Sequence, residues 1–112
     1  MSPLDYKSSR INKSQARKQI SKILSLYPRN VWFSKHALEE LKADDLVTTD
    51  AFNVLKSPDS RIYQEGELEN GSYRYRLETG NILLVIAFQE DGNGLTVVTG
   101  WDKRKRIREN KS

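Results

Sequence analysis

Residues 71–104 constrain the fold of this chain more than any other stretch. They contain three apolar runs separated by two turn signals, one at 79–80 and one at 90–93. Short runs rich in branched and aromatic residues, separated by Gly- and Asn-containing turns, are typical of antiparallel hairpins. The stretch therefore predicts three strands in a meander.

The first of these strands alternates apolar residues with arginines. Successive side chains of a strand point to opposite faces of the sheet. Tyr73, Tyr75 and Leu77 are therefore expected on one face, and Arg74 and Arg76 on the other. The apolar face is expected to meet the core.

A two-residue turn at 79–80 fixes the expected register of the meander. It pairs Arg76 with Leu83 and, after the second turn, places Trp101 on the core side of the sheet. A slip of one residue would bury both arginines, so this choice of faces is strongly preferred. The arginine face is then expected to hold an apolar floor made of Leu83, Val85 and Val98.

Three segments upstream have helical spacing. Apolar residues recur every three to four positions in 14–27, and two shorter helices are expected at 34–45, where Ser34 caps the start, and near 50–57. A fourth strand is expected at 61–64. This order predicts an α+β fold in which N-terminal helices pack on one face of a three- to four-stranded antiparallel sheet.

A length of 112 residues suits one domain with a modest core. We expect a flexible basic N-terminus over 1–12, a single α+β domain over 13–104 and a basic tail over 105–112. The N-terminus lacks the apolar segment of a secretory signal, and no apolar run is long enough to span a membrane. These features predict a cytoplasmic protein that makes no membrane contact.

Charge is segregated along the chain. The net charge is +4, but residues 1–30 carry +6, residues 31–101 carry −6 and residues 102–112 carry +4. Basic ends commonly contact phosphate or an acidic partner, although solvated ends of a soluble protein have the same pattern. With no cysteine and one histidine, the chain is expected to use neither a metal nor a cofactor.

Arg74 and Arg76 beside an apolar floor suit an RNA ligand, because guanidinium groups bind phosphates bidentately and apolar or aromatic side chains receive bases. An acidic protein segment could bind the same surface. The further residues expected to contact RNA are basic: Arg17, Lys18, Lys35, Arg104, Lys105 and Arg106.

Cleavage of RNA without a metal requires a base, a cation beside the phosphorane and an acid for the leaving oxygen. The candidate cations are Arg74, Arg76 and Lys103. His36 is the candidate base, because histidine is the residue type suited to proton transfer near neutral pH. A first-turn histidine next to a lysine is, however, more often a solvated or capping residue. Glu65 and Glu67 could also act as bases, although an acidic loop near a phosphate site is more simply solvent-facing. The alternative proton carriers are Tyr63, Tyr73 and Tyr75.

The chain resembles the MqsR- and RelE-like mRNA-interferase toxins and the related BrnT-like small toxins. The resemblance covers residues 12–104. It rests on the basic first helix, the Ser/His-Ala-Leu start of the segment 34–45, the string DAFNVL and above all Tyr-Arg-x-Arg-Leu-x-Thr-Gly at 73–80. It implies a RelE-like fold and a cytoplasmic bacterial toxin that cleaves mRNA, free or on the ribosome, without a metal. It also implies a cognate antitoxin as partner.

Two positions depart from the family pattern. Leu83 stands where MqsR-type sites have a tyrosine, and Trp101 stands where they have a lysine. The family's catalytic residues therefore cannot be carried over, and a site at His36 and the two arginines is the expected replacement. The alternative is a non-catalytic module of the same fold that binds RNA or a protein partner.

Overall fold

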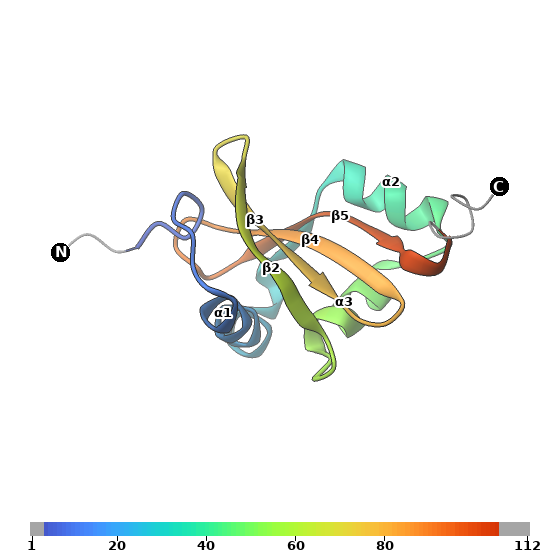
Figure 1. The fold of residues 1–112 in the computed structure, drawn as a ribbon, viewed down its shortest axis with the longest axis horizontal. Helices are drawn as coiled ribbons and strands as arrows, with labels where there is room; N and C mark the ends of the chain where they lie inside the picture. Colours follow the sequence, from blue (N-terminus) through green and yellow to red (C-terminus); the bar gives the residue numbers. More distant parts are fainter. Residues whose placement is uncertain (1–3, 106–112) are drawn as a thin grey trace.

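The computed structural model describes residues 4–105 (Figure 1). Helices come first and the strands of the meander last, as an α+β fold requires. The elements are α1 (Lys13–Leu26), a 3-10 turn (Pro28–Asn30), β1 (Val31–Phe33), α2 (Lys35–Ala43), α3 (Thr48–Lys56), β2 (Arg61–Glu69), β3 (Ser72–Glu78), β4 (Ile82–Phe88) and β5 (Leu95–Asp102).

The first two helices have side-chain caps. The Asn12 side chain accepts a hydrogen bond from the Gln15 backbone N–H, and the Gln15 side chain accepts one from Asn12. Ser34 caps α2 by accepting from the Ala37 N–H, and its hydroxyl donates to the Val98 carbonyl of β5. These bonds satisfy backbone groups that a helix end leaves unpaired, and the Ser34 bond also fixes α2 to β5.

The sheet has five strands in the order β1-β5-β4-β3-β2, which corrects the expectation of three to four antiparallel strands. The extra strand is β1, which pairs with β5 in parallel, whereas all other pairs are antiparallel. A parallel pair needs a long connection, and the chain between β1 and β5 supplies one. The second difference is β2, which continues to Glu69 instead of ending near residue 64.

The β3–β4 register confirms the predicted faces but not the predicted turn. The Thr79 N–H donates to the Ile82 carbonyl at 3.0 Å, so the turn is at 80–81 and not at 79–80. Arg76 consequently pairs with Val85 and not with Leu83. Because the shift along β4 is two residues, every side chain keeps its expected face.

A β-bulge in β5 corrects the predicted position of Trp101. Val85 pairs with Thr99 and Ile86 pairs with Val97, so Val98 is an extra residue in the ladder. A bulge reverses the alternation of the residues that follow it. Trp101 therefore lies on the arginine face, opposite Leu83, and not on the core side.

The sequence predicted that all the helices pack on one face of the sheet, and the position of α2 differs from this prediction. α1 and α3 lie below the sheet in Figure 1 and contact each other, whereas α2 runs beside β5 at the sheet edge. All three contribute to one core. Its largest fully buried members are Tyr75, Phe88, Ile20, Ile23, Leu41, Leu55, Leu77, Leu84, Ile86, Leu95 and Val97.

The segment before α1, which the sequence analysis assigned to a flexible N-terminus, makes specific contacts. The Tyr6 N–H donates to the carbonyl of Glu90, and the Lys7 carbonyl accepts from the N–H of Tyr73. Ile11 is buried, and its N–H donates to the Tyr75 hydroxyl at 3.0 Å. Residues 4–12 are thus part of the folded domain.

Candidate functional site

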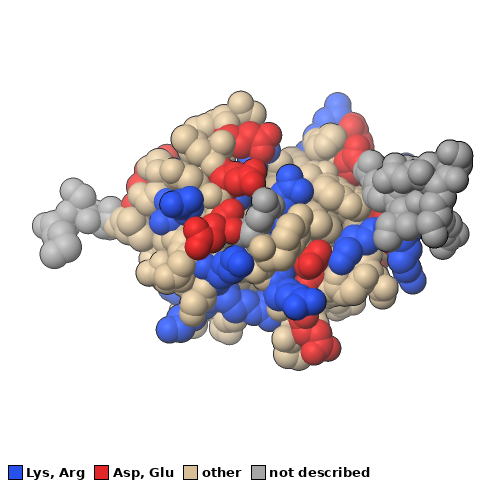
Figure 2. All heavy atoms as spheres, in the orientation of Figure 1, with Lys and Arg blue, Asp and Glu red and all other residues tan. Residues whose placement is uncertain are grey.

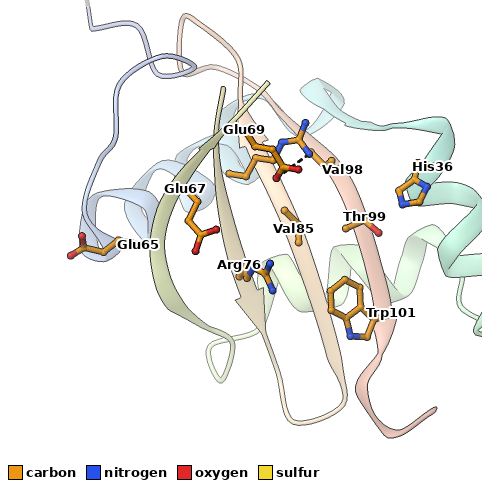
Figure 3. Close-up of a pocket in the computed structure, with 10 residues that line it drawn as sticks. His36, Glu65, Glu67, Glu69, Arg76, Val85, Val98, Thr99 and Trp101 are labelled. Atoms are coloured by element: carbon orange, nitrogen blue, oxygen red, sulfur yellow. Dashed lines mark ion pairs between the residues drawn. The ribbon is translucent and has the colours of Figure 1, made fainter. Parts of the chain in front are cut away.

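A pocket of about 250 Å³ lies on the sheet face that carries the two arginines (Figure 3). β2, β3, β4 and β5 form its floor and one side, and the first turn of α2 forms the other. Its lining residues are His36, Glu65, Glu67, Glu69, Arg74, Arg76, Val85, Val98, Thr99 and Trp101.

The two arginines are held from the β2 side. Arg74 is mostly buried and its Nη1 lies 3.6 Å from Oε2 of Glu69, an ion pair drawn in Figure 3. Its Nε is buried and makes no hydrogen bond to any described residue. Arg76 donates to the Tyr63 hydroxyl at 3.3 Å. This bond, followed by the charges of Glu67 and Glu69, raises the pKa of Arg76 above its ordinary value.

Three glutamates of β2 line the pocket. Glu65 and Glu67 were expected as possible bases or, more simply, as solvent-facing residues of an acidic loop, whereas Glu69 was expected in a turn. β2 instead runs through all three, and Glu67 pairs directly with Arg74 in the ladder. Glu65 also lies 3.9 Å from Arg10. The recurrence of Glu at every second position, 65, 67 and 69, is itself a strand pattern and could have located them.

The apolar part of the pocket differs slightly from the predicted floor. Val85 and Val98 line the pocket as predicted, but Leu83 does not. Leu83 is buried opposite Trp101, whose indole lines the pocket and is half-buried. The bulge at Val98 is what brings the indole to this face.

His36 lines the same pocket from α2. Its side chain is 64% exposed, and its Nε2 lies 3.9 Å from Oε1 of Glu40 one turn along the helix. Figure 3 places the imidazole across β5 from the arginines, beyond Thr99. The structure thus brings together three of the four predicted catalytic residues: His36, Arg74 and Arg76.

Lys103, the fourth, lies at the β3–β4 turn and does not line the pocket. Its ammonium group contacts the Glu78 carboxylate and donates to the Thr79 carbonyl, both at 3.1 Å. Its backbone N–H donates to the Asn81 carbonyl. These contacts hold the ammonium group by the turn, apart from the residues that line the pocket.

None of the predicted RNA-binding residues within 4–105 lines the pocket. Arg17 donates to the Ser57 carbonyl and the Ser60 hydroxyl, so it fixes α1 to the α3–β2 connection. The other described members are exposed or in ion pairs: Lys18 and Lys35 are exposed, Arg104 pairs with Asp102, and Lys105 pairs with Asp45. Arg106 lies outside the described residues.

The charge of the pocket is mixed. Its lining has three glutamates and two arginines, and the face seen in Figure 2 likewise shows acidic and basic side chains intermingled. A phosphate in the pocket would meet two guanidinium groups that already have acidic or phenolic neighbours. A phosphate would therefore compete with these neighbours for the two guanidinium groups, and the pocket does not offer a uniformly basic surface to a long backbone.

The arrangement supplies the groups for proton transfer and charge stabilisation. A carboxylate next to arginines is a base, an imidazole can act as an acid, and guanidinium groups stabilise a negative transition state. Within residues 4–105 no group of three or more His, Asp or Glu side chains is placed to hold a metal ion. No described helix is long and apolar enough to cross a membrane. Comparisons with protein-family models, with curated proteins and with solved structures find no match to this chain.

Proposed function

We propose that the protein is a metal-independent endoribonuclease that cleaves mRNA, the toxin component of a toxin–antitoxin pair in the bacterial cytoplasm. The observation that carries the proposal is the convergence of His36, the β2 glutamates and the arginines on one pocket. The sequence resemblance to the RelE- and MqsR-like toxins supplies the biological setting.

In the proposed reaction Glu67 is the base. Its carboxylate, opposite Arg74 in the ladder, accepts the proton of a ribose 2′-OH. The 2′-oxygen attacks the adjacent phosphorus while the bond from phosphorus to the 5′-oxygen breaks. His36, on the other side of the pocket, acts as the acid and donates a proton to that leaving oxygen. The products are a 2′,3′-cyclic phosphate and a free 5′-OH.

The arginines stabilise the charge that develops during this reaction. Arg74 and Arg76 lie on one strand and one face, so both guanidinium groups can approach the same phosphate. Preorganised cations of this kind commonly contribute 10²- to 10³-fold or more to a rate. This division of roles needs no residue at the positions of Leu83 and Trp101, where the related toxins have a tyrosine and a lysine.

A second candidate is a non-catalytic module that binds RNA or a protein partner. It is favoured by one observation: both arginines already have partners, Glu69 for Arg74 and Tyr63 for Arg76. In this case the glutamates would only position the arginines, and no cleavage would occur. The two candidates therefore differ in whether RNA is broken.

The test is growth on induced expression in a bacterial host without a cognate antitoxin. The ribonuclease predicts growth arrest with falling mRNA levels, and loss of both effects in the Arg74→Ala/Arg76→Ala variant. A Lys13→Ala/Lys22→Ala variant removes the same charge from exposed positions of α1 that have no proposed role, and it should still cause arrest. Arrest by neither wild type nor control, at equal protein levels, would favour the binding module.

A further inference from the structure

A second hollow adjoins the pocket and shares three of its walls. It has a volume of about 430 Å³ and is lined by His36, Glu40, Thr99 and Trp101. His36, Thr99 and Trp101 also line the pocket that holds the arginines. The two hollows are therefore neighbours, and these three side chains stand at their junction.

The junction is a ridge on β5. Thr99 and Trp101 follow one another along the same side of the strand in Figure 3, with the arginines to one side and α2 to the other. The bulge at Val98 sets this orientation, because without it the two side chains would point into the core. A ligand longer than one hollow must pass over this ridge.

We propose that the site binds single-stranded RNA as two consecutive nucleotides, one in each hollow, with the phosphate that joins them at the ridge. This inference rests on the proposed ribonuclease function and adds the minimum length of the ligand and the side chain that receives its base. Both volumes are close to the lower end of small-molecule pockets, about 300–1,000 Å³, which suits one nucleotide unit each.

The position of the phosphate follows from the shared residues. A scissile phosphate has one nucleotide on each side, so the group that protonates its leaving oxygen must be accessible from both hollows. His36 meets this condition. The nucleotide on the arginine side lies over Val85 and Val98, and its base stacks on Trp101.

Stacking on Trp101 explains why the RNA must be single-stranded. Aromatic side chains receive bases that are splayed out of a helix, whereas bases within a duplex are already stacked on their neighbours. The indole is half-buried, so its position is fixed while part of it stays open to the hollows. Trp101 is thus the residue that selects an unpaired base beside the scissile bond.

The experiment measures the binding of short oligonucleotides that cannot be cleaved. The probes are the four nucleoside 3′-phosphates, the sixteen 2′-O-methyl dinucleotides and trinucleotides extended from the tightest of these. The chain has two tryptophans, so the Trp32→Phe variant makes intrinsic fluorescence report on Trp101 alone. We expect the best dinucleotide to quench this emission and to bind at least about ten-fold more tightly than its constituent mononucleotide. A third nucleotide should add less than the second.

Two substitutions test the stacking role. Trp101→Leu should weaken dinucleotide binding about ten-fold, the loss typical of a removed base–aromatic stack, whereas Trp101→Phe should stay within about three-fold of wild type. Trp32→Leu is the matched control, because Trp32 is exposed and does not line either hollow. Competition against a labelled dinucleotide gives the affinity of wild type and of each of the three variants. Thermal unfolding verifies that each variant is folded.

Equal affinity for mononucleotides and dinucleotides, or unchanged affinity in Trp101→Leu, would overturn the inference. If wild type still cleaves RNA in either case, the ribonuclease stands and only the two-nucleotide site falls. If the protein binds the dinucleotide tightly but cleaves no RNA, the two-nucleotide site stands and the proposed ribonuclease function falls. Failure of every probe to bind would overturn the inference and leave a protein segment as the occupant of the hollows.

Discussion

Glu67 of β2 pairs directly with Arg74 of β3, and both side chains line the same pocket. Carboxylate and guanidinium thus come from adjacent strands at one level of the sheet, next to Arg76 and its partner Tyr63. A rigid sheet holds such groups more precisely than loops do. The proposed reaction depends on this pairing, because the pairing places the Glu67 carboxylate, which accepts a proton, beside the two arginines.

Glu67→Gln should separate catalysis from binding. Removal of the proposed base should slow RNA cleavage by about 10²- to 10⁴-fold. RNA binding should stay equal or become tighter, because the substitution removes a negative charge from the pocket. Cleavage rates of a labelled single-stranded RNA and its affinity, measured side by side, check both expectations.

Glu69→Gln is the control for that experiment. It removes the same charge, but from the carboxylate paired with Arg74 at 3.6 Å, which has no proton-transfer role in the proposed reaction. We expect tighter RNA binding and cleavage within about ten-fold of wild type. Equal loss of cleavage in both variants would mean that Glu67 has no special role.

Lys103→Ala tests whether that residue takes part in catalysis. Its ammonium group contacts Glu78 and the Thr79 carbonyl and does not line the pocket, so the cleavage rate should be unchanged. A partly exposed ion pair of this kind is worth about 0–1 kcal/mol, and the free energy of unfolding should fall by no more than this. A 100-fold loss of cleavage with intact folding would instead return Lys103 to the site.

Gly66→Ala should destabilise the fold. A Cβ atom on Gly66 would lie 2.6 Å from Cε2 of Tyr75, whose ring is fully buried. Overpacking of this kind costs about 1–3 kcal/mol, measurable as a shift of the denaturant midpoint. Gly80→Ala, where a Cβ meets no atom within 4 Å, should change stability by less than about 0.5 kcal/mol. Similar stabilities for the two variants would contradict the packing of Tyr75 against β2.

Asp102 should make stability depend on pH at the acidic end. The hydrogen bonds from Arg104 lower the pKa of Asp102 below its ordinary value of 3.8. A carboxyl with a lowered pKa in the folded state stabilises the fold above its unfolded value, and this contribution is lost as the pH falls through the folded value. Asp102→Asn should therefore be less stable than wild type at neutral pH, and the difference should shrink below about pH 4.

Urea unfolding of wild type and Asp102→Asn at several pH values checks this dependence. Asp59→Asn is a suitable control, because Asp59 is an exposed carboxylate in the turn between α3 and β2. That variant should follow the wild-type curve. A difference for Asp102→Asn that stays constant down to the lowest pH would show that the ion pair with Arg104 is not its source.

The part of the fold that local pattern determines was predictable. Strand alternation placed Arg74 and Arg76 on one face, and the structure keeps them there although the turn moved by one residue. The Ser34 cap was likewise readable from the sequence. Such features depend on neighbours within a few residues, which a sequence displays directly.

The features missed depend on contacts between distant segments. The sequence of residues 31–33 does not indicate that they pair in parallel with β5. The extra residue at Val98 places Trp101 on the face of the sheet opposite to the predicted one. β2 was predicted to be too short because Gly66 interrupts the segment, and glycine is depleted in strands. The glycine is there because Tyr75 packs against it, a reason visible only once the strands are paired.

The proposed ribonuclease is tested most directly by incubating the purified protein with single-stranded RNA in the presence of a metal chelator. Wild type and the Lys13→Ala/Lys22→Ala control should both yield fragments ending in a 2′,3′-cyclic phosphate, identified by their mass. The Arg74→Ala/Arg76→Ala variant, folded by circular dichroism, should be slower by about 10²-fold or more. Intact RNA with wild type, or equal cleavage by the arginine variant, would contradict the account.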